Sequence, residues 1–154
     1  VYTFVHSPRR AAPCDAARGH GPHAPSRDHH RSAAATTMGR LTTHVLDTMN
    51  GCPAAGMAVT LWRLAPQGDQ RLAALRLNDD GRADLPLLEG AALQPGRYRL
   101  VFAVADYFRA RGVVLPEPPF LDEVPLDFGL ADPALHYHVP LLASPWAYST
   151  YRGS

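Results

Sequence analysis

The segment LHYHVPLL, residues 135–142, decides the fold of this chain. Its residues alternate between two kinds, and successive residues of a β-strand point to opposite faces of a sheet. One face is apolar and suited to a core, with Tyr137, Val139 and Leu141. The other face carries His136, His138 and Pro140. The segment therefore predicts a half-buried strand whose outward face holds two histidines.

Short segments of similar pattern run through the chain from residue 38 to its end. The turn sequences NG at 50–51 and NDDG at 78–81 separate some of them. One helix of about two turns is predicted at residues 105–112, where a glycine ends it. The predicted strands cover residues 41–47, 57–64, 72–77, 82–87, 98–104, 121–128, 135–142 and 146–151. Short strands at regular spacing with a single helix predict an all-β sandwich.

The same alternation sorts the side chains of the first and last predicted strands. In the first strand His44 lies opposite the face that carries Thr43 and Val45, and in the last strand Ser149 and Tyr151 share a face. The side chains that this parity assigns to outward faces are His44, His136, His138, Ser149 and Tyr151. Parity alone does not place these faces near one another.

Three histidines on outward strand faces are sufficient for hydrolytic chemistry. A neutral imidazole, with an ordinary pKa of about 6.5, takes a proton from water near neutral pH. Arg82 directly follows the turn at 78–81 and is a candidate for stabilising negative charge on a carbonyl oxygen. Two other interpretations stay open at this point. His-x-His spacing with a third histidine is also typical of a three-histidine zinc site, and each of these residues alone is commonly an ordinary surface residue.

Residues 1–37 differ in composition from the rest of the chain. They hold four prolines, two glycines, five arginines and five of the eight histidines, and have few bulky apolar side chains. Such a segment buries too little apolar surface to offset the entropy of ordering it. We therefore predict a disordered extension at residues 1–37 and one domain at residues 38–154, with Met38 as a plausible start site.

Charge and composition limit the partners and the compartment of the protein. The formal net charge is +1, and ten arginines against twelve carboxylates give −2 for residues 38–154. This balance gives no basis for a nucleic-acid or acidic-membrane partner. No apolar run approaches the roughly 18 residues of a membrane span, and the first residues do not resemble a secretory signal. With Cys14 and Cys52 interpreted as free thiols, these features predict a cytoplasmic protein.

Four motifs, in the order found here, resemble those of the 5-hydroxyisourate hydrolases, the enzyme branch of the transthyretin-like family. They are LTTHVLD followed by NGCPA (41–47 and 50–54), NDDGR (78–82), LHYHVPLLASPWAYST (135–150) and the terminal YRGS (151–154). The resemblance covers about three-quarters of the chain. His44, Arg82, His138 and Tyr151 are the hydrolase residue types, whereas the hormone-carrying branch has other types at the matching positions.

The resemblance implies a transthyretin-like sandwich of two four-stranded sheets, assembled as a homotetramer whose subunit pairs enclose a channel with a site at each mouth. It implies hydrolysis of the N1–C6 amide bond of 5-hydroxyisourate, giving 2-oxo-4-hydroxy-4-carboxy-5-ureidoimidazoline, without a metal or organic cofactor. By analogy, His44 and His138 would activate water and Arg82 would bind the substrate oxygens and stabilise the oxyanion. Tyr151 would contact the substrate and Ser154 would help to close the pocket, while His136 would have a supporting role.

Two alternatives to this hydrolase are kept. One is a transthyretin-like carrier of a small ligand without catalysis, and the other is a zinc-dependent hydrolase that uses the histidines of the strand faces.

Overall fold

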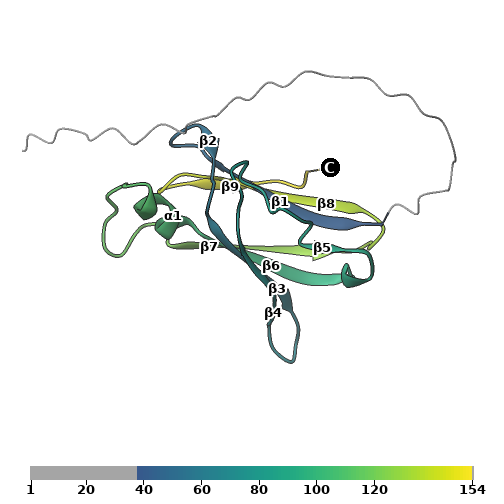
Figure 1. Cartoon of the computed structure of the whole chain (residues 1–154). Coiled ribbons are helices and arrows are strands. Elements are labelled where there is room, and N and C mark those ends of the chain that lie inside the picture. Colours follow the sequence, from purple (N-terminus) through teal and green to yellow (C-terminus); the bar gives the residue numbers. More distant parts are fainter. Residues whose placement is uncertain (1–37, 154) are drawn as a thin grey trace, which may run out of the picture.

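The computed structural model of the protein describes residues 38–153. In it two β-sheets pack as layers, with one helix at one end of the sandwich (Figure 1). The predicted sandwich with a single α-helix is therefore confirmed for the described part of the chain. The prediction of disorder for residues 1–37, and the position of Ser154, lie outside the described residues.

Each sheet has four strands in a continuous path, and one short strand is added to the first. The first sheet has the order β2-β1-β8-β9, and β5 also pairs with β1. The second sheet has the order β4-β3-β6-β7. The first sheet is built from β1 (Arg40–Asp47), β2 (Cys52–Pro53), β5 (Leu88–Glu89), β8 (His136–Ala143) and β9 (Tyr148–Thr150). The second is built from β3 (Ala58–Leu64), β4 (Gln70–Arg76), β6 (Gly96–Ala103) and β7 (Glu123–Leu130). The helices are η1 (Gly90–Ala92), a single 3-10 turn, and α1 (Val104–Ala110).

The strand predicted at residues 82–87 is wrong. Arg82 forms only an isolated bridge with His44, and the strand β5 begins later, at Leu88. The side chain of Asn78 accepts hydrogen bonds from the backbone N–H groups of Asp80 and Arg82, at 3.1 and 3.0 Å, so the turn extends further than its sequence suggests. Pro86 also lacks the N–H group that a strand would use.

The register of β1 and β8 positions the outward face. These two strands, far apart in sequence, pair in parallel, with Arg40 opposite His136 and Thr42 opposite His138. Their inward residues enter the core as predicted, since Tyr137, Val139 and Leu141 are all buried. The core is completed by side chains of the second sheet and α1, of which the largest fully buried ones are Tyr98, Phe102, Phe108, Leu61 and Leu100.

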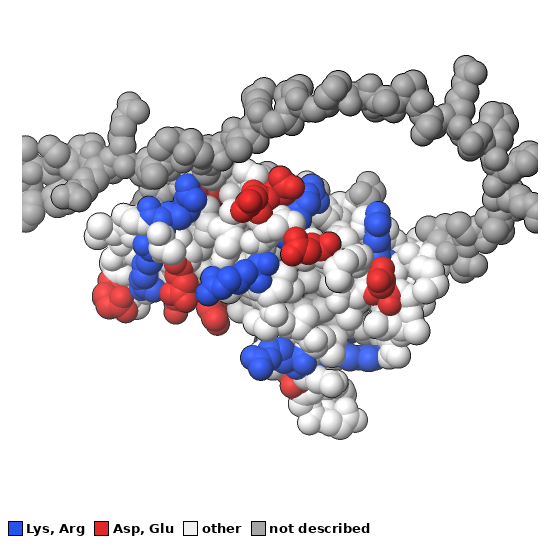
Figure 2. Space-filling model, viewed as in Figure 1, with Lys and Arg blue, Asp and Glu red and all other residues white. Residues whose placement is uncertain are grey.

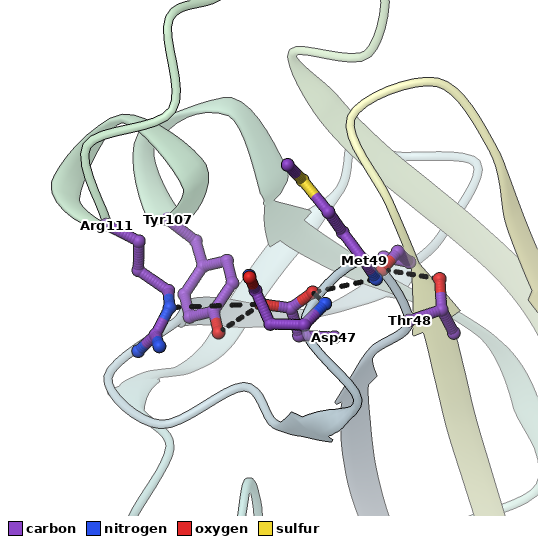
Figure 3. Close-up of polar contacts among 7 residues, drawn as sticks. Asp47, Thr48, Met49, Tyr107 and Arg111 are labelled. Carbon is purple, nitrogen blue, oxygen red and sulfur yellow. Dashed lines mark hydrogen bonds and ion pairs between the residues drawn. The ribbon is translucent and has the colours of Figure 1, made fainter. Parts of the chain in front are cut away.

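A buried carboxylate joins the end of β1 to α1 (Figure 3). Asp47 is 1 % exposed, and its Oδ1 accepts hydrogen bonds from the backbone N–H groups of Met49 (3.0 Å) and Asn50 (2.9 Å). Its Oδ2 accepts one from the Tyr107 hydroxyl at 2.9 Å, and Arg111 Nε lies 3.9 Å away. Burial, and then the hydrogen bond to Asp47, raise the pKa of Tyr107 far above its ordinary value, so this phenol stays protonated. The network fixes where β1 ends and α1 docks.

The surface carries both signs of charge. Arginines and carboxylates are interspersed on the face that Figure 2 shows. Among the helices of residues 38–153, none is long and apolar enough to cross a bilayer. The free-thiol interpretation is wrong for Cys52, which is disulfide-bonded. Cys14 lies outside the described residues.

Candidate active site

The outward face of β1 and β8 forms one wall of a pocket of about 430 Å³. The opposite wall is the irregular segment at 82–86, which replaced the expected strand. The polar and charged side chains that line the pocket are Arg40, Thr42, Thr43, Arg82, Asp84, His136 and His138. Two guanidinium groups and two imidazoles thus share one concave surface, which is suited to a small molecule with several hydrogen-bond-accepting oxygens.

Thr42 holds both histidines of β8. Its Oγ1 lies 2.9 Å from His136 Nε2 and 2.9 Å from His138 Nδ1. The parallel register brings these three side chains together, because outward residues of adjacent paired strands are neighbours. The two imidazoles are tilted relative to each other, with ring centroids 6.5 Å apart. His138 Nε2 is not used by the hydrogen bond to Thr42, and it is the nitrogen available to a bound molecule.

The turn at residues 78–82 brings Arg82 to His44. Gly81 has φ = 69°, a left-handed conformation that favours glycine. A Cβ at this position would lie 2.5 Å from the carbonyl oxygen of Val45, so the turn approaches β1 more closely than any side chain permits. The carbonyl of Gly81 accepts a hydrogen bond from the backbone N–H of Val45 at 2.9 Å. Arg82 is thereby fixed as the bridge partner of His44.

All three histidines are held in the neutral form. Burial, and then the positive charge of Arg82, lower the pKa of His44, while the backbone and charge of Asp80 oppose this. Burial lowers the pKa of His138, with further contributions from Arg82, His44 and His136. Burial and then Arg40 lower the pKa of His136. Because the ordinary value is already about 6.5, each imidazole is a free base at neutral pH and can accept a proton.

The C-terminal segment is only partly directed to this pocket. The backbone N–H of Gly153 donates to the carbonyl of His138 at 2.9 Å, and a Cβ on Gly153 would lie 2.7 Å from the imidazole Cδ2 of His138. Arg152 packs its guanidinium over the ring of Tyr137, at 4.9 Å from the centroid. These contacts explain why the segment lies on β8: glycine permits the approach and the cation packs on an aromatic face.

The structure therefore brings together three of the five predicted site residues. His44, Arg82 and His138 interact with one another across the outward face. Tyr151 instead borders a separate pocket beside β7 and is 60 % exposed, so within this subunit it does not line the histidine pocket. Ser154 lies outside the described residues.

Sequence reasoning missed three residues near the site. Parity places Thr42, and by the same rule Arg40, on the strand face of His44, but only the pairing with β8 shows what they contact. Gly153 carried no signal apart from its place in the terminal YRGS.

The geometry gives no support to the zinc interpretation. Within residues 38–153, no group of three or more His, Cys, Asp or Glu side chains is arranged to hold a metal ion. In the described part of the chain, His136 Nε2 and His138 Nδ1 are both engaged with the Thr42 hydroxyl rather than converging on a common point.

Comparison with known proteins identifies the family. Residues 41–153, almost all of the described domain, match the model of the HIUase/Transthyretin family. The chain belongs to the HIUase/Transthyretin family. Within it, the chain is 61 % identical over 117 residues to the 5-hydroxyisourate hydrolase of Ralstonia nicotianae, covering 76 % of this chain and 100 % of that protein. It is 57 % identical over 117 residues to the 5-hydroxyisourate hydrolase of Pseudomonas aeruginosa, covering 76 % of this chain and 93 % of that protein.

A solved structure of the HIUase/Transthyretin family has the same fold. The 5-hydroxyisourate hydrolase of Klebsiella pneumoniae is 34 % identical to this chain and superposes with a TM-score of 0.63. The similarity covers 75 % of this chain and 99 % of that one. The resemblance noted from four motifs is therefore confirmed along the whole domain, including the segments between them.

Proposed function

We propose that the protein hydrolyses 5-hydroxyisourate in purine degradation, cleaving the N1–C6 amide bond to give 2-oxo-4-hydroxy-4-carboxy-5-ureidoimidazoline. One observation carries the proposal: His44, Arg82 and His138, from three segments far apart in sequence, meet on one face. The hydrolases of Ralstonia and Pseudomonas that share most of this domain's sequence support the choice of substrate.

The pair His44 and His138 activates the attacking water. A neutral imidazole removes one proton from water while the oxygen of that water adds to C6. The C6 carbonyl oxygen then becomes an oxyanion. Arg82, next to both histidines, binds the substrate oxygens and stabilises this oxyanion. Collapse of the tetrahedral intermediate breaks the C6–N1 bond, and N1 takes the proton back from the imidazolium. The new carboxylic acid at C6 loses its proton to solvent, and the carboxylate that results leaves from beside Arg82.

Tyr151 and Ser154 are proposed to contact the substrate in the assembled protein rather than in one isolated subunit. We propose a homotetramer whose subunit pairs enclose a channel, with a pocket at each mouth. Support comes from the C-terminal stretch beside the histidine face, where Trp146, Tyr148 and Tyr151 are 56, 46 and 60 % exposed. Exposed aromatic residues gathered on one stretch are typical of a protein interface.

Analytical ultracentrifugation tests this assembly. It should give four times the chain mass, and a monomer at assay concentration would contradict the assembly.

The pocket favours hydrolysis over simple carriage of a ligand. A carrier of small aromatic molecules needs mainly apolar walls, whereas this pocket has Arg40, Arg82, His136 and His138 in its lining. Neutral imidazoles beside a guanidinium are the components of proton transfer and oxyanion stabilisation.

The deciding experiment follows the decay of 5-hydroxyisourate, generated in place by urate oxidase, by ultraviolet absorbance. Chelator-treated protein should accelerate the decay, and Arg82→Glu should lose on the order of 100- to 1,000-fold in rate. Arg97→Glu is the matched control, since Arg97 is an exposed arginine of β6 in the other sheet. Decay at the spontaneous rate with the parent protein would refute hydrolysis and favour the carrier. Loss of activity on chelation, restored by zinc, would instead favour the zinc hydrolase.

The proposed compartment is the cytoplasm. The alternative is an oxidising compartment, and the disulfide at Cys52 is the observation on its side. Fractionation of cells that produce the tagged protein distinguishes the two, because periplasmic release without cytosolic markers would contradict the cytoplasmic assignment.

A further inference from the structure

The hydroxyl of Thr42 has one proton but two imidazole partners. Its oxygen lies 2.9 Å from His136 Nε2 and 2.9 Å from His138 Nδ1. A hydroxyl donates one hydrogen bond and accepts through its lone pairs. When it donates to one imidazole nitrogen, the other nitrogen must carry a proton to donate to it. As long as the hydroxyl donates to one of these two nitrogens, the protonation of His136 Nε2 and that of His138 Nδ1 are therefore opposite and linked.

Two arrangements satisfy this rule when both imidazoles are neutral. In the first, His138 Nδ1–H donates to Thr42, and Thr42 donates to an unprotonated His136 Nε2. His138 Nε2 then has a free lone pair directed away from Thr42. In the second, His136 Nε2–H donates to Thr42, and Thr42 donates to His138 Nδ1, so His138 carries its proton on Nε2. Of these two, only the first makes His138 a base toward the pocket.

We propose that Thr42 is a positioning residue that sets the tautomer of His138 and passes protons between His138 and His136 during hydrolysis. This inference rests on the proposed function for its catalytic part, whereas the tautomer coupling stands on the geometry alone. Thr42 acts through the two histidines and needs no contact with the substrate.

The proton movements balance over one turnover. In the first arrangement His138 Nε2 removes a proton from the attacking water and becomes an imidazolium. Its Nδ1 proton then moves to the Thr42 oxygen while the Thr42 proton moves to His136 Nε2. His138 is now neutral with its proton on Nε2, and His136 holds the positive charge. The reverse transfer restores the imidazolium at His138, which protonates N1 as the C6–N1 bond breaks.

The charges around the two histidines make such a transfer useful. His138 lies among Arg82, His44 and His136, so an imidazolium there is repelled by a guanidinium and its neighbours. His136 is paired with Arg40, whose charge lowers its pKa, and Arg82 is not among the charges that do so. Transfer through Thr42 therefore moves positive charge away from the guanidinium that holds the oxyanion. The position of Thr42, opposite His138 in the parallel register, allows both contacts at once.

Substitutions at Thr42 separate the hydroxyl from the shape of the side chain. Thr42→Val keeps the branched shape and removes the hydroxyl, whereas Thr42→Ser keeps the hydroxyl. Thr60→Val is the matched control, because Thr60 is a strand threonine of β3 that accepts a hydrogen bond from Trp62 at 2.9 Å. Histidine tautomers are measured by long-range ¹H–¹⁵N NMR, and kcat, KM and the pH profile by the ultraviolet assay.

The proposal predicts a specific combination of results. Thr42→Val should lose on the order of 10- to 100-fold in kcat with KM little changed, because a mispositioned base affects the chemical step. Its ¹⁵N spectrum should show His138 moving from the Nδ1–H form toward a mixture, and the acidic limb of its pH profile should shift. Thr42→Ser should restore both the tautomer and most of kcat, and Thr60→Val should change neither.

Three outcomes would overturn the proposal. They are an unchanged kcat in Thr42→Val, a lowered kcat with the parental tautomer, and a lowered kcat in Thr42→Ser equal to that in Thr42→Val. Failure of the proposed function is a separate result: the parent protein would then not hydrolyse the substrate at all. In that case an unaltered tautomer in Thr42→Val would refute the coupling as well, and an altered one would establish it without the catalytic role.

Discussion

At the scale of the residue, neutral imidazoles beside a guanidinium distinguish this face from an ordinary sheet surface. The types of His44, Arg82 and His138 were identified from the sequence, because parity and a turn boundary are visible in it. The contact of Thr42 with two histidines was not, since it depends on a pairing between residues 94 and 96 positions apart. The hydrogen-bonding capacity of one hydroxyl becomes informative only when both of its partners are known.

Removing His44 tests its share in water activation. His44→Ala should lower kcat by roughly 100-fold or more, because it removes a proton acceptor next to Arg82. The ultraviolet assay measures the rate, and circular dichroism shows whether the sheets remain. The histidines outside the described domain give a control: His23→Ala should retain the parental rate. Parental kcat in His44→Ala would remove His44 from the mechanism.

The pKa of His138 should depend on Arg82. Arg82 is the largest of the neighbouring charges that lower it, so Arg82→Gln removes a repulsion against the imidazolium and the pKa should rise. NMR titration of the His138 ring protons measures this, with Arg97→Gln as the control. An unchanged or lowered pKa would show that the guanidinium does not act on this imidazole.

The same shifts give a sign to the pH dependence of stability. The three histidines have lower pKa values in the folded protein than in the unfolded chain, where the value is about 6.5. The unfolded chain therefore binds more protons in acid, and the free energy of unfolding falls as the pH drops from about 6.5 to below the folded values. Urea titrations at pH 7.5 and 5.5 should show this loss. This loss of unfolding free energy should be smaller in His138→Gln, which lacks one of the three imidazoles.

At the scale of the element, the site depends on where strands end as much as on where they run. Most strands were predicted within a few residues, because alternation and turn dipeptides mark them. The error at residues 82–87 came from the side chain of Asn78, which prolongs the turn through contacts that composition does not reveal. This same error hid the pocket, since the irregular segment forms its second wall.

The turn at Gly81 should be sensitive to a single methyl group. Gly81→Ala places a Cβ 2.5 Å from the Val45 carbonyl oxygen at φ = 69°, so it should destabilise the protein by about 2 kcal/mol or more and displace Arg82. Gly51→Ala is the matched control, with the same φ of 69° and no atom within 4 Å of the added Cβ. It should cost about 1 kcal/mol and leave kcat unchanged. Equal effects of the two substitutions on kcat would contradict the docking of this turn.

The hydrogen bond between Tyr107 of α1 and Asp47 at the end of β1 should affect the stability of the protein and leave its catalytic rate unchanged. Tyr107→Phe removes the hydroxyl that donates to Asp47 and should lower the free energy of unfolding by about 1 to 2 kcal/mol. Urea denaturation measures this change, and kcat should stay within about twofold, because Tyr107 lies at the other end of β1 from Arg40. A large fall in kcat in a Tyr107→Phe protein that is still fully folded would show that this hydrogen bond affects the geometry of the pocket.

At the scale of the whole molecule, the fold class was predictable and the assembly of the face was not. Alternating segments allow an all-β sandwich to be recognised, whereas the order of strands in a sheet depends on contacts between distant segments. The shape of the site follows from one such contact. β1 and β8, the first and last long strands, are partners.

That partnership has a consequence for the time at which the protein becomes active during its synthesis. The contacts of Thr42 with His136 and His138 span 94 and 96 positions, and Gly153 bonds to His138 later still. Contacts of such sequence separation are the slowest to form and contribute most to contact order. The strands of the second sheet, β3, β4, β6 and β7, pair with one another and need no residue after 130. The outward face that carries the site therefore cannot form until the segment after residue 136 is available to pair with β1, so a nascent chain that lacks this segment has no active site.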